Sequence, residues 1–321
     1  MQKFLLQKFF EKLFEAIEES VSECKSKTIS LSGGLDSSII AYFLKGKNVN
    51  AVAMTSRDFI STDLTYCQLI AKTFDIPLEI IMPQTEELLS SIEGTIKILK
   101  NFNDIEIRNS IVIYNILKSI KNSGKSSIIV GDGADELFAG YSFFLEKNYK
   151  ELEKELQRIW EVMHFPSKIL GRSLGVKVET PYLNEKVLNL AKIIPANLKV
   201  NEYNGKKYGK WILRKTFEEK LPNNVVWRKK SPIQDGAGTV ELTNLFDTII
   251  PDKIFEEKIK KIKDSDNVSI RTKESLHYYE IYRKYFDPPE KLNDSNTMCP
   301  YCKYKIKQSS KFCRMCGSFP I

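Results

Sequence analysis

The sequence has no long hydrophobic run. None of its apolar stretches approaches the ~18–20 residues that cross a membrane. With 42% hydrophobic and 28% charged residues and a mean hydropathy of -0.29, the composition is typical of a soluble globular protein. The first twenty residues place Lys and Glu around a Phe/Leu stripe, which predicts an amphipathic helix packed against the domain rather than a signal peptide. We therefore expect a cytoplasmic protein that does not bind a membrane.

Histidine is scarce. His164 and His277 are the only two, and neither has the spacing typical of metal ligands, so we expect both to be structural. Nucleophilic catalysis of the Ser/His or Cys/His type is therefore not supported.

Acidic residues are scarce at the C-terminal end. The chain carries a formal net charge of +8, and from Lys291 onward there are six basic residues against the single acid Asp294, a net charge of +5. The first 290 residues therefore carry only 8 − 5 = +3. A basic tail can meet nucleic acid, an acidic protein or nothing at all.

Short apolar runs alternate with helical patterns through the first half of the chain. This alternation predicts an α/β domain with a parallel sheet, whose ligands would lie at the carboxyl ends of the strands. From 143 to 287 the pattern becomes mostly helical, and Pro288 and Pro289 end the last helix. We expect a domain over 1–290, a polar linker over 291–298 and a small module over 299–321. The predicted strands are 28–31, 49–54, 78–82 and 126–130, and the predicted helices are 35–44, 63–74, 85–100 and 111–121.

The last module carries four cysteines, Cys299, Cys302, Cys313 and Cys316, spaced as two C-x2-C knuckles. Such knuckles can place four thiolates around one Zn²⁺. The segment is too short to build a core, so the metal would supply its folding energy. Two disulfides or redox pairs are the alternatives, and they are uncommon in a cytosolic chain. We predict a structural zinc ribbon, whose partner, protein or RNA, the sequence leaves open.

The segment from Ser32 to Ser38, SGGLDSS, follows the first predicted strand and opens a helix. Its backbone N–H groups, its hydroxyls and the helix N-terminus would converge on one spot, and the glycines permit close approach by a ligand. These features suit a polyanion. The segment differs from the G-x-x-x-x-G-K-[ST] loop in spacing and in having no lysine. It resembles the pyrophosphate loop, SGGxDS, of enzymes that split ATP into AMP and pyrophosphate.

A second polar segment, GDGADELFAGY, runs from Gly131 to Tyr141 after a buried strand pattern. Three carboxylates among glycines are costly there unless they meet a cation or a substrate. The segment resembles the G-E-G-x-D-E-x-F-x-G-Y signature of the synthetase domain of the asparagine synthetase family, whose relatives include β-lactam and carbapenam synthetases. Shorter matches extend the resemblance over roughly residues 1–238: Ile107-Arg108, Pro181-Tyr182-Leu183, Gly209–Arg214, Leu221-Pro222, Trp227–Lys230 and Asp235-Gly236.

The resemblance implies a fold and a reaction. The fold would be a parallel sheet of the adenine nucleotide alpha-hydrolase type (HUP-like), with a helical C-terminal half. The reaction would use ATP and Mg²⁺ to activate a small-molecule or protein carboxylate as an acyl-adenylate. Attack by ammonia or an amine would then give an amide, AMP and pyrophosphate.

It also implies roles for individual residues. Asp36 and Asp135 would bind Mg²⁺ through oxygen ligands. Lys210 and Lys230 would neutralise the phosphates, with Lys230 stabilising charge as the acyl-adenylate forms and breaks. Asp132 stands where the family has a glutamate near the intermediate. The pyrophosphate would be cradled by Ser32, Gly33, Gly34, Ser37 and Ser38, the adenine would lie near Met54 and Gly131, and Arg108 would contact pyrophosphate or form a structural salt bridge.

The sequence departs from the family pattern in three places. About 27 residues precede the first predicted strand, too few for the family's glutaminase domain. We therefore expect nitrogen from free ammonia, a separate glutaminase subunit or an amine on the substrate. Asp132 is one methylene shorter than the family's glutamate. Lys177 and Glu179 replace a Glu and an Arg, which either preserves a salt bridge in reverse or signals a changed acceptor, and Asn184 replaces an Asp.

Two other functions remain open from the sequence. An RNA-modifying adenylating enzyme guided by the ribbon would use the basic tail and the same kind of loop. A non-enzymatic regulatory paralogue would use the ribbon as a clamp for a partner.

Overall fold

The computed structural model describes residues 2–292, 297–308 and 310–321. Part of the predicted linker, residues 293–296, lies outside the described residues. The chain divides into two compact units. Unit 1 consists of Met1–Met54, Thr62–Ile81 and Ile116–Pro232, and unit 2 of Thr55–Ser61, Met82–Asn115 and Ile233–Ile321. Within the described part of the chain, no helix has both the length and the apolar composition that crossing a membrane requires.

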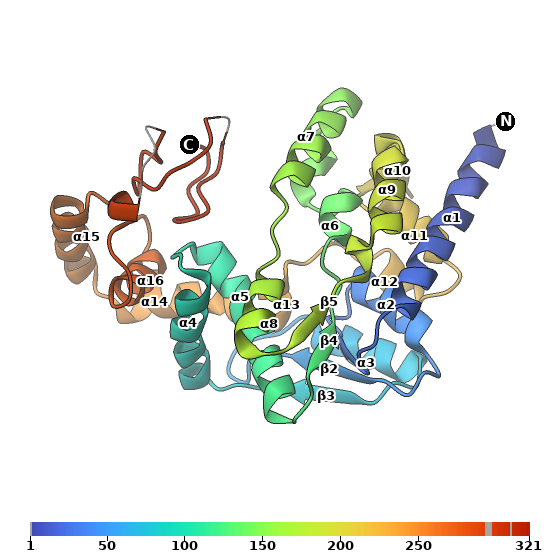
Figure 1. The fold of residues 1–321 in the computed structure, drawn as a ribbon, viewed down its shortest axis with the longest axis horizontal. Coiled ribbons are helices and arrows are strands. Elements are labelled where there is room, and N and C mark those ends of the chain that lie inside the picture. Colours follow the sequence, from blue (N-terminus) through green and yellow to red (C-terminus); the bar gives the residue numbers. More distant parts are fainter. Residues whose placement is uncertain (1, 293–296, 309) are drawn as a thin grey trace. The chain divides into compact units, whose positions relative to one another are not determined.

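A parallel sheet of five strands forms the centre of unit 1 (Figure 1). The strand order is β3-β2-β1-β4-β5, and Ile29 of β1 pairs with Ala51 on one side and Ile129 on the other. The strands are β1 (Thr28–Ser30), β2 (Asn50–Met54), β3 (Leu78–Ile81), β4 (Ser127–Ile129) and β5 (Lys177–Glu179). Because the chain leaves β1 on one side and returns to β4 on the other, the carboxyl ends of these strands flank a topological switch point. The expected α/β class with a parallel sheet is confirmed.

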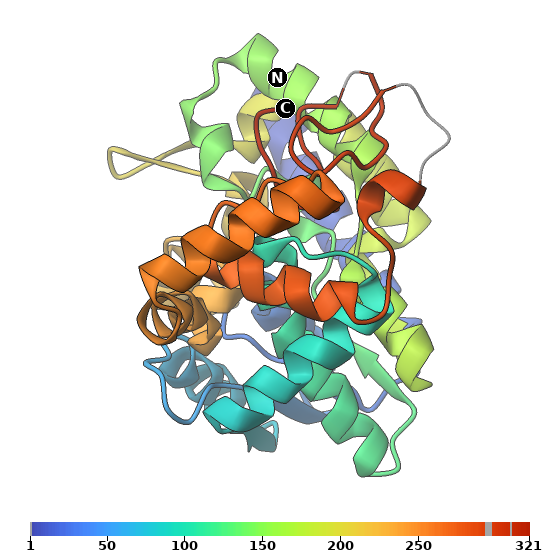
Figure 2. The same cartoon turned by 90° about the vertical axis from the view of Figure 1, so that its left-hand side faces the viewer.

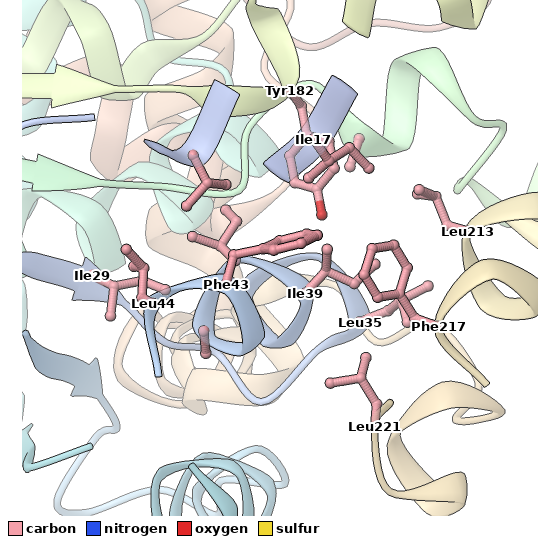
Figure 3. Close-up of a cluster of buried hydrophobic side chains, with 14 of the residues drawn as sticks. Ile17, Ile29, Leu35, Ile39, Phe43, Leu44, Tyr182, Leu213, Phe217 and Leu221 are labelled. Carbon is pink, nitrogen blue, oxygen red and sulfur yellow. The ribbon is translucent and has the colours of Figure 1, made fainter. Parts of the chain in front are cut away.

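The core of unit 1 packs helices against this sheet. In α1 (Gln2–Ser22), the apolar stripe containing Leu13, Ile17 and Val21 is buried, which confirms a helix packed on the domain. In α2 (Leu35–Leu44), Leu35, Ile39 and Phe43 lie in one cluster with Phe217 (Figure 3). Phe43 and Phe217 meet edge to face at 5.6 Å. This packing anchors the helix that follows the SGGLDSS segment.

The remaining elements of unit 1 confirm the helical character predicted for the second half, with strands that the sequence pattern does not reveal. β5 joins the main sheet, and β6 (Asn201–Tyr203) pairs with β7 (Lys206–Tyr208) in a separate hairpin. The helices are α3 (Leu64–Thr73), α6 (Ala134–Leu137), α7 (Tyr149–Val162), α8 (Pro166–Leu174), α9 (Glu185–Ile193), α10 (Ala196–Lys199), α11 (Trp211–Phe217) and α12 (Asn223–Val226).

Unit 2 is built from helices and the C-terminal segment (Figure 2). α5 (Asp104–Asn122) begins in unit 2 and ends in unit 1, and it starts earlier than the predicted 111–121. α16 (Lys273–Arg283) packs against α4 (Thr85–Leu99) and α14 (Leu242–Ile249). The other helices are α13 (Ile233–Ala237) and α15 (Asp252–Asp266).

Candidate active site

The SGGLDSS segment is a tight turn from β1 into α2. Gly33 has a φ of +67°, and a Cβ there would lie 2.5 Å from Tyr66 Cβ and 2.6 Å from the backbone nitrogen of Cys67. Both the left-handed conformation and the contact with α3 therefore require glycine at this position. The turn places the N-terminus of α2, beginning at Leu35, beside the carboxyl end of β1.

Three serine hydroxyls fix the shape of this turn. Ser38 Oγ donates to the carbonyl of Gly34 at 2.7 Å, and Ser37 Oγ donates to the same carbonyl at 3.2 Å. The backbone nitrogen of Ser32 donates to Ser37 Oγ at 3.2 Å, and the Oγ atoms of Ser32 and Ser37 lie 3.1 Å apart. The residues predicted as a pyrophosphate cradle are therefore together in one preformed loop.

Lys210 lies between the two carboxylates predicted to bind Mg²⁺. Its Nζ is 2.5 Å from Asp36 Oδ2 and 2.6 Å from Asp135 Oδ1, and its side chain is only 4% exposed. Lys210 has a φ of +55° at the start of α11, a strained conformation for a residue other than glycine. A hydrogen bond of 2.9 Å from its backbone nitrogen to the carbonyl of Phe138 holds it there. The structure thus joins residues 36, 135 and 210 in one cluster.

Two glycines leave space for this cluster. A Cβ on Gly140 would lie 1.8 Å from Asp135 Oδ1 and 2.3 Å from Lys210 Cε. A Cβ on Gly209 would lie 2.0 Å from the carbonyl oxygen of Ala139. No side chain fits at either position, because real Cβ contacts of this kind are much longer. The glycines of the GDGADELFAGY and GKWILR segments therefore permit the approach of Asp135 and Lys210.

Lys230 adds a second cation, with its Nζ 2.5 Å from Asp135 Oδ2. Burial alone would raise the pKa of Asp135, but the ammonium groups of Lys210 and Lys230 outweigh it and hold that pKa below its usual range. For Asp36, burial dominates and raises the pKa despite Lys210. Burial would lower the pKa of Lys230, yet Asp135 and Asp36 raise it, so Lys230 stays charged.

One carboxylate oxygen of this cluster has no hydrogen-bond donor among the described residues. Asp36 Oδ1 is buried and has no hydrogen-bond partner among the residues that the structure describes. A buried carboxylate oxygen without a donor is costly, and Mg²⁺ is a hard cation that prefers carboxylate oxygens. Asp36 and Asp135 therefore fit the ligand set predicted for magnesium.

Asp132 and Glu136 flank Asp135 in the same segment. Ser167 Oγ, in the first turn of α8, donates to Asp132 Oδ2. Burial raises the pKa of Asp132, and the hydrogen bond from Ser167 opposes that rise. Tyr141 OH donates to Glu136 Oε1 at 2.6 Å. This second contact gives Glu136 a role in holding the loop, whereas Asp132 and Ser167 form a pair that the sequence pattern does not reveal.

Arg214 is a residue whose role the sequence analysis did not identify. Its Nε donates to the carbonyl of Gly209 at 2.8 Å, and its Nη1 donates to the carbonyls of Val226 and Arg228, the latter at 3.0 Å. The guanidinium thereby ties the segment that carries Lys210 to the segment that carries Lys230. The match to the family over Gly209–Arg214 was the available signal for this residue.

The sequence predicts that the adenine lies near Met54 and Gly131. Met54 is the last residue of β2 and is 7% exposed, and Gly131 follows β4. A Cβ on Gly131 would lie 3.3 Å from Asp36 Cβ, so this glycine also lies close to the loop. Met54 thus ends one of the two strands that neighbour β1 in the sheet, and Gly131 follows the other.

Arg108 belongs to unit 2 and makes its contacts there. Its Nε lies 3.3 Å from Glu274 Oε1, and its Nη1 donates to Thr243 Oγ1 at 2.6 Å. Thr243 in turn donates to Glu274 Oε2 at 2.9 Å. Of the two roles that the sequence left open for Arg108, these contacts correspond to the structural salt bridge.

The residues that depart from the family pattern have structural contacts. Lys177 Nζ and Glu179 Oε1 form a salt bridge of 2.8 Å on β5. Glu179 Oε2 also accepts hydrogen bonds of 2.9 Å from the backbone nitrogens of Lys25 and Ser26. Asn184 caps α9 by accepting from the backbone nitrogen of Lys186 at 3.0 Å. The exchange of Asp for Asn thus occurs at a helix cap, where both residues are favoured.

The four C-terminal cysteines converge in unit 2. All four Sγ atoms lie within 4.8 Å of one another and are buried. Cys299 and Cys316 have their Sγ atoms 3.8 Å apart, and Cys302 and Cys313 have theirs 3.6 Å apart. Tetrahedral Zn²⁺ with Zn–S bonds of about 2.3 Å requires Sγ atoms about 3.8 Å apart. The group fits a metal and not two disulfides, whose S–S bonds are about 2.0 Å.

Comparisons with known proteins agree with the motifs. The asparagine synthase family model matches residues 9–172 and 169–298. The chain is 27% identical over 280 residues to the glutamine-hydrolyzing asparagine synthetase of Gallus gallus, covering 80% of this chain and 48% of that protein. It is 29% identical over 282 residues to asparagine synthetase B of Escherichia coli (strain K12), covering 81% of this chain and 50% of that protein.

The chain thus spans about half the length of these curated relatives. Among solved structures, the NMN synthetase from Francisella tularensis matches with a TM-score of 0.38 and 14% identity, covering 87% of this chain and 93% of that one. A likeness of this degree carries no information about function.

Proposed function

The chain belongs to the asparagine synthase family, and from that membership we propose that it is an ATP-dependent ligase that activates a carboxylate as an acyl-adenylate. Ammonia or an amine then displaces AMP and leaves an amide. One observation carries this proposal: Lys210 bridges Asp36 and Asp135, with Lys230 on the second carboxylate, beside the loop at the carboxyl end of β1. The arrangement concentrates cations and carboxylates where a Mg²⁺-bound polyphosphate would lie.

In this proposal the loop from Ser32 to Ser38 binds the leaving pyrophosphate through its backbone N–H groups and the N-terminus of α2. Lys210 and Lys230 neutralise the charge that develops on the phosphates as the bond to the α-phosphorus breaks. Mg²⁺ bound by Asp36 and Asp135 would draw further charge off the pyrophosphate. Asp132, held by Ser167, lies in the same segment as Asp135 and would accept a proton from the attacking nitrogen.

The acceptor and the nitrogen donor are separate proposals. The salt bridge between Lys177 and Glu179 preserves a paired charge on β5, and Asn184 acts as a helix cap. Neither change therefore requires a new acceptor, and aspartate is the first carboxylate to test. Free ammonia is the first nitrogen donor to test, followed by a separate glutaminase subunit and by amines on the substrate.

The acyl-adenylate can be tested by isotope transfer. A carboxylate labelled with ¹⁸O is incubated with ATP, Mg²⁺ and ammonium, and the AMP is analysed by mass spectrometry. An acyl-adenylate leaves one ¹⁸O atom of the carboxylate in AMP when the amide forms. The proposal is supported if any carboxylate tested, beginning with aspartate, transfers its label to AMP. The transfer should be lost in Lys230→Ala and kept in the control Lys229→Ala. Pyrophosphate release without ¹⁸O transfer would contradict the acyl-adenylate.

We also propose that the cysteine group binds Zn²⁺ as a structural site. Four thiolates complete a tetrahedral shell and leave no open position for a substrate. Elemental analysis of the purified full chain should give one zinc per polypeptide. A Cys302→Ser variant should lose the metal, whereas Cys24→Ser, which lies in unit 1, should retain it.

A further inference from the structure

The cysteine module, of which residues 299–308 and 310–321 are described, makes main-chain contacts with the rest of unit 2. The backbone nitrogen of Ser269 donates to the carbonyl of Tyr301 at 2.7 Å, and the backbone nitrogen of Phe102 donates to the carbonyl of Met315 at 3.0 Å. Arg271 Nη2 donates to the carbonyl of Cys316 at 3.2 Å. The first knuckle thus contacts the chain before α16, and the second contacts the chain before both α5 and α16.

The second knuckle also fits closely over the start of α5. Gly317 has a φ of +73°, and a Cβ there would lie 2.6 Å from Asn103 Oδ1. The same Asn103 oxygen accepts from the backbone nitrogen of Glu106 at 3.3 Å, and Asp104 Oδ1 accepts from Ile105 at 2.9 Å. Gly317 therefore lies against the side chains that satisfy the first N–H groups of α5.

The two helices whose N-terminal ends lie beside the module, α5 and α16, contribute to one buried polar network. Arg108 of α5 pairs with Glu274 of α16, and these side chains are 12% and 2% exposed. Tyr278 OH donates to Glu274 Oε1 at 2.8 Å, and Ser275 Oγ donates to Asp104 Oδ2 at 3.2 Å. Buried charges of this kind stay paired only while the two helices keep their relative positions.

The module has little to hold it together without a metal. Its buried residues are the four cysteines, Met315, Gly317 and Ser318, which form no hydrophobic core. A segment of this size obtains its folding free energy from metal binding. Without a bound metal, the carbonyls of Tyr301, Met315 and Cys316 would lose their fixed positions, and the donors on Phe102, Ser269 and Arg271 would lose their acceptors.

We infer that metal binding by Cys299, Cys302, Cys313 and Cys316 closes a clasp that holds the N-terminal ends of α5 and α16 together. The partner of the module is then the rest of unit 2 in the same chain. The clasp fixes the network around Arg108 and Glu274, and it rests on the proposed zinc site but not on the proposed ligase reaction.

Hydrogen exchange on the full chain tests the clasp. The zinc-loaded protein is compared with protein treated with a strong chelator and with treated protein to which zinc is returned. Removal of zinc should speed hydrogen exchange at the amides of Phe102 and Ser269 by at least tenfold, and return of zinc should restore their protection. Strand β1 in unit 1 serves as the internal reference and should not change. Loss of zinc without faster exchange at either amide would overturn the inference, as would a chain that binds no zinc.

Variants that retain all four cysteines test the clasp contacts without removing a metal ligand. Arg271→Ala removes the donor to Cys316, and Gly317→Ala pushes the knuckle away from Asn103. Both should retain one zinc per chain and still lose protection at Phe102, whereas Arg271→Lys should recover part of it. If both variants keep zinc and full protection, the contacts do not form a clasp and the inference fails.

Discussion

Replacing Lys210 by methionine should destabilise the protein, because Asp36 and Asp135 lose the ammonium group that lies between them. Methionine fills the space of the aliphatic stem and removes only the ammonium. The contacts of 2.5 and 2.6 Å place Asp36 Oδ2 and Asp135 Oδ1 at most about 5 Å apart. Two unit charges at that distance repel by about 3 kcal/mol at an effective dielectric constant of 20. Breaking one side of a buried ion pair typically costs about 3–5 kcal/mol. The free energy of unfolding should therefore fall by about 3 kcal/mol at neutral pH.

The deficit should depend on pH. Without the ammonium, the pKa of each carboxyl rises, so the folded variant binds protons that the unfolded chain does not. Stability then increases as pH falls, and the difference from the native chain should shrink between pH 8 and pH 5.

Urea unfolding at several pH values measures this prediction, with Lys215→Met as the control. Lys215 pairs with Glu218 at 2.5 Å, but both side chains are about a quarter exposed or more. Its removal should cost at most about 1 kcal/mol. Equal losses for the two variants, or a deficit for Lys210→Met that does not change with pH, would refute the reasoning.

Three further predictions concern the same unit. Gly140→Ala should lower kcat by about 100-fold, because the new Cβ displaces Asp135 by about 1 Å or more. Its control is Gly171→Ala, which introduces a clash between α8 and β5 and should lower the melting temperature but not kcat per folded molecule. An unchanged kcat in Gly140→Ala together with a lowered kcat in Gly171→Ala would contradict the prediction. Ser167→Ala should raise the pKa of Asp132 and move the acid limb of the pH–rate profile for amide formation to higher pH, and an unmoved limb would exclude the pair. Asn184→Asp should leave the relative kcat/KM for different acceptors unchanged and cost at most about 1 kcal/mol in chemical unfolding, whereas a switch of acceptor would show that the side chain contacts substrate.

The sequence predicts which two segments meet at the candidate site, for a physical reason. Polar segments after β1 and β4 must meet, because the carboxyl ends of parallel strands lie on one edge of the sheet. The segments beginning at Ser32 and Gly131 are therefore neighbours in the fold, as expected. The resemblance also supplied Lys210 and Lys230, but no local pattern shows that Lys210 lies between two carboxylates. That position depends on residues 174 positions apart in the chain.

Other features could not be read from the sequence. β5 has only three residues, two of them charged, so it carries no apolar run. Its place in the sheet depends on pairing with β4 and on Glu179, whose carboxylate accepts from the chain before β1. The contacts of the cysteine module could not be predicted from the sequence, because main-chain hydrogen bonds from Phe102 and Ser269 require no particular residue type. The polar composition of residues 291–298 alone predicts a linker before the module and therefore a separate module.

Arg214 has a consequence for the connection between α11 and α12. Its guanidinium binds the carbonyls of Gly209, Val226 and Arg228, so this side chain joins the two lysine-bearing segments independently of the peptide between them. That peptide passes through the exposed residue Glu219. The chain could therefore be cut or lengthened there while both lysines keep their positions, which makes this connection the natural place for a tag, a label or a new terminus.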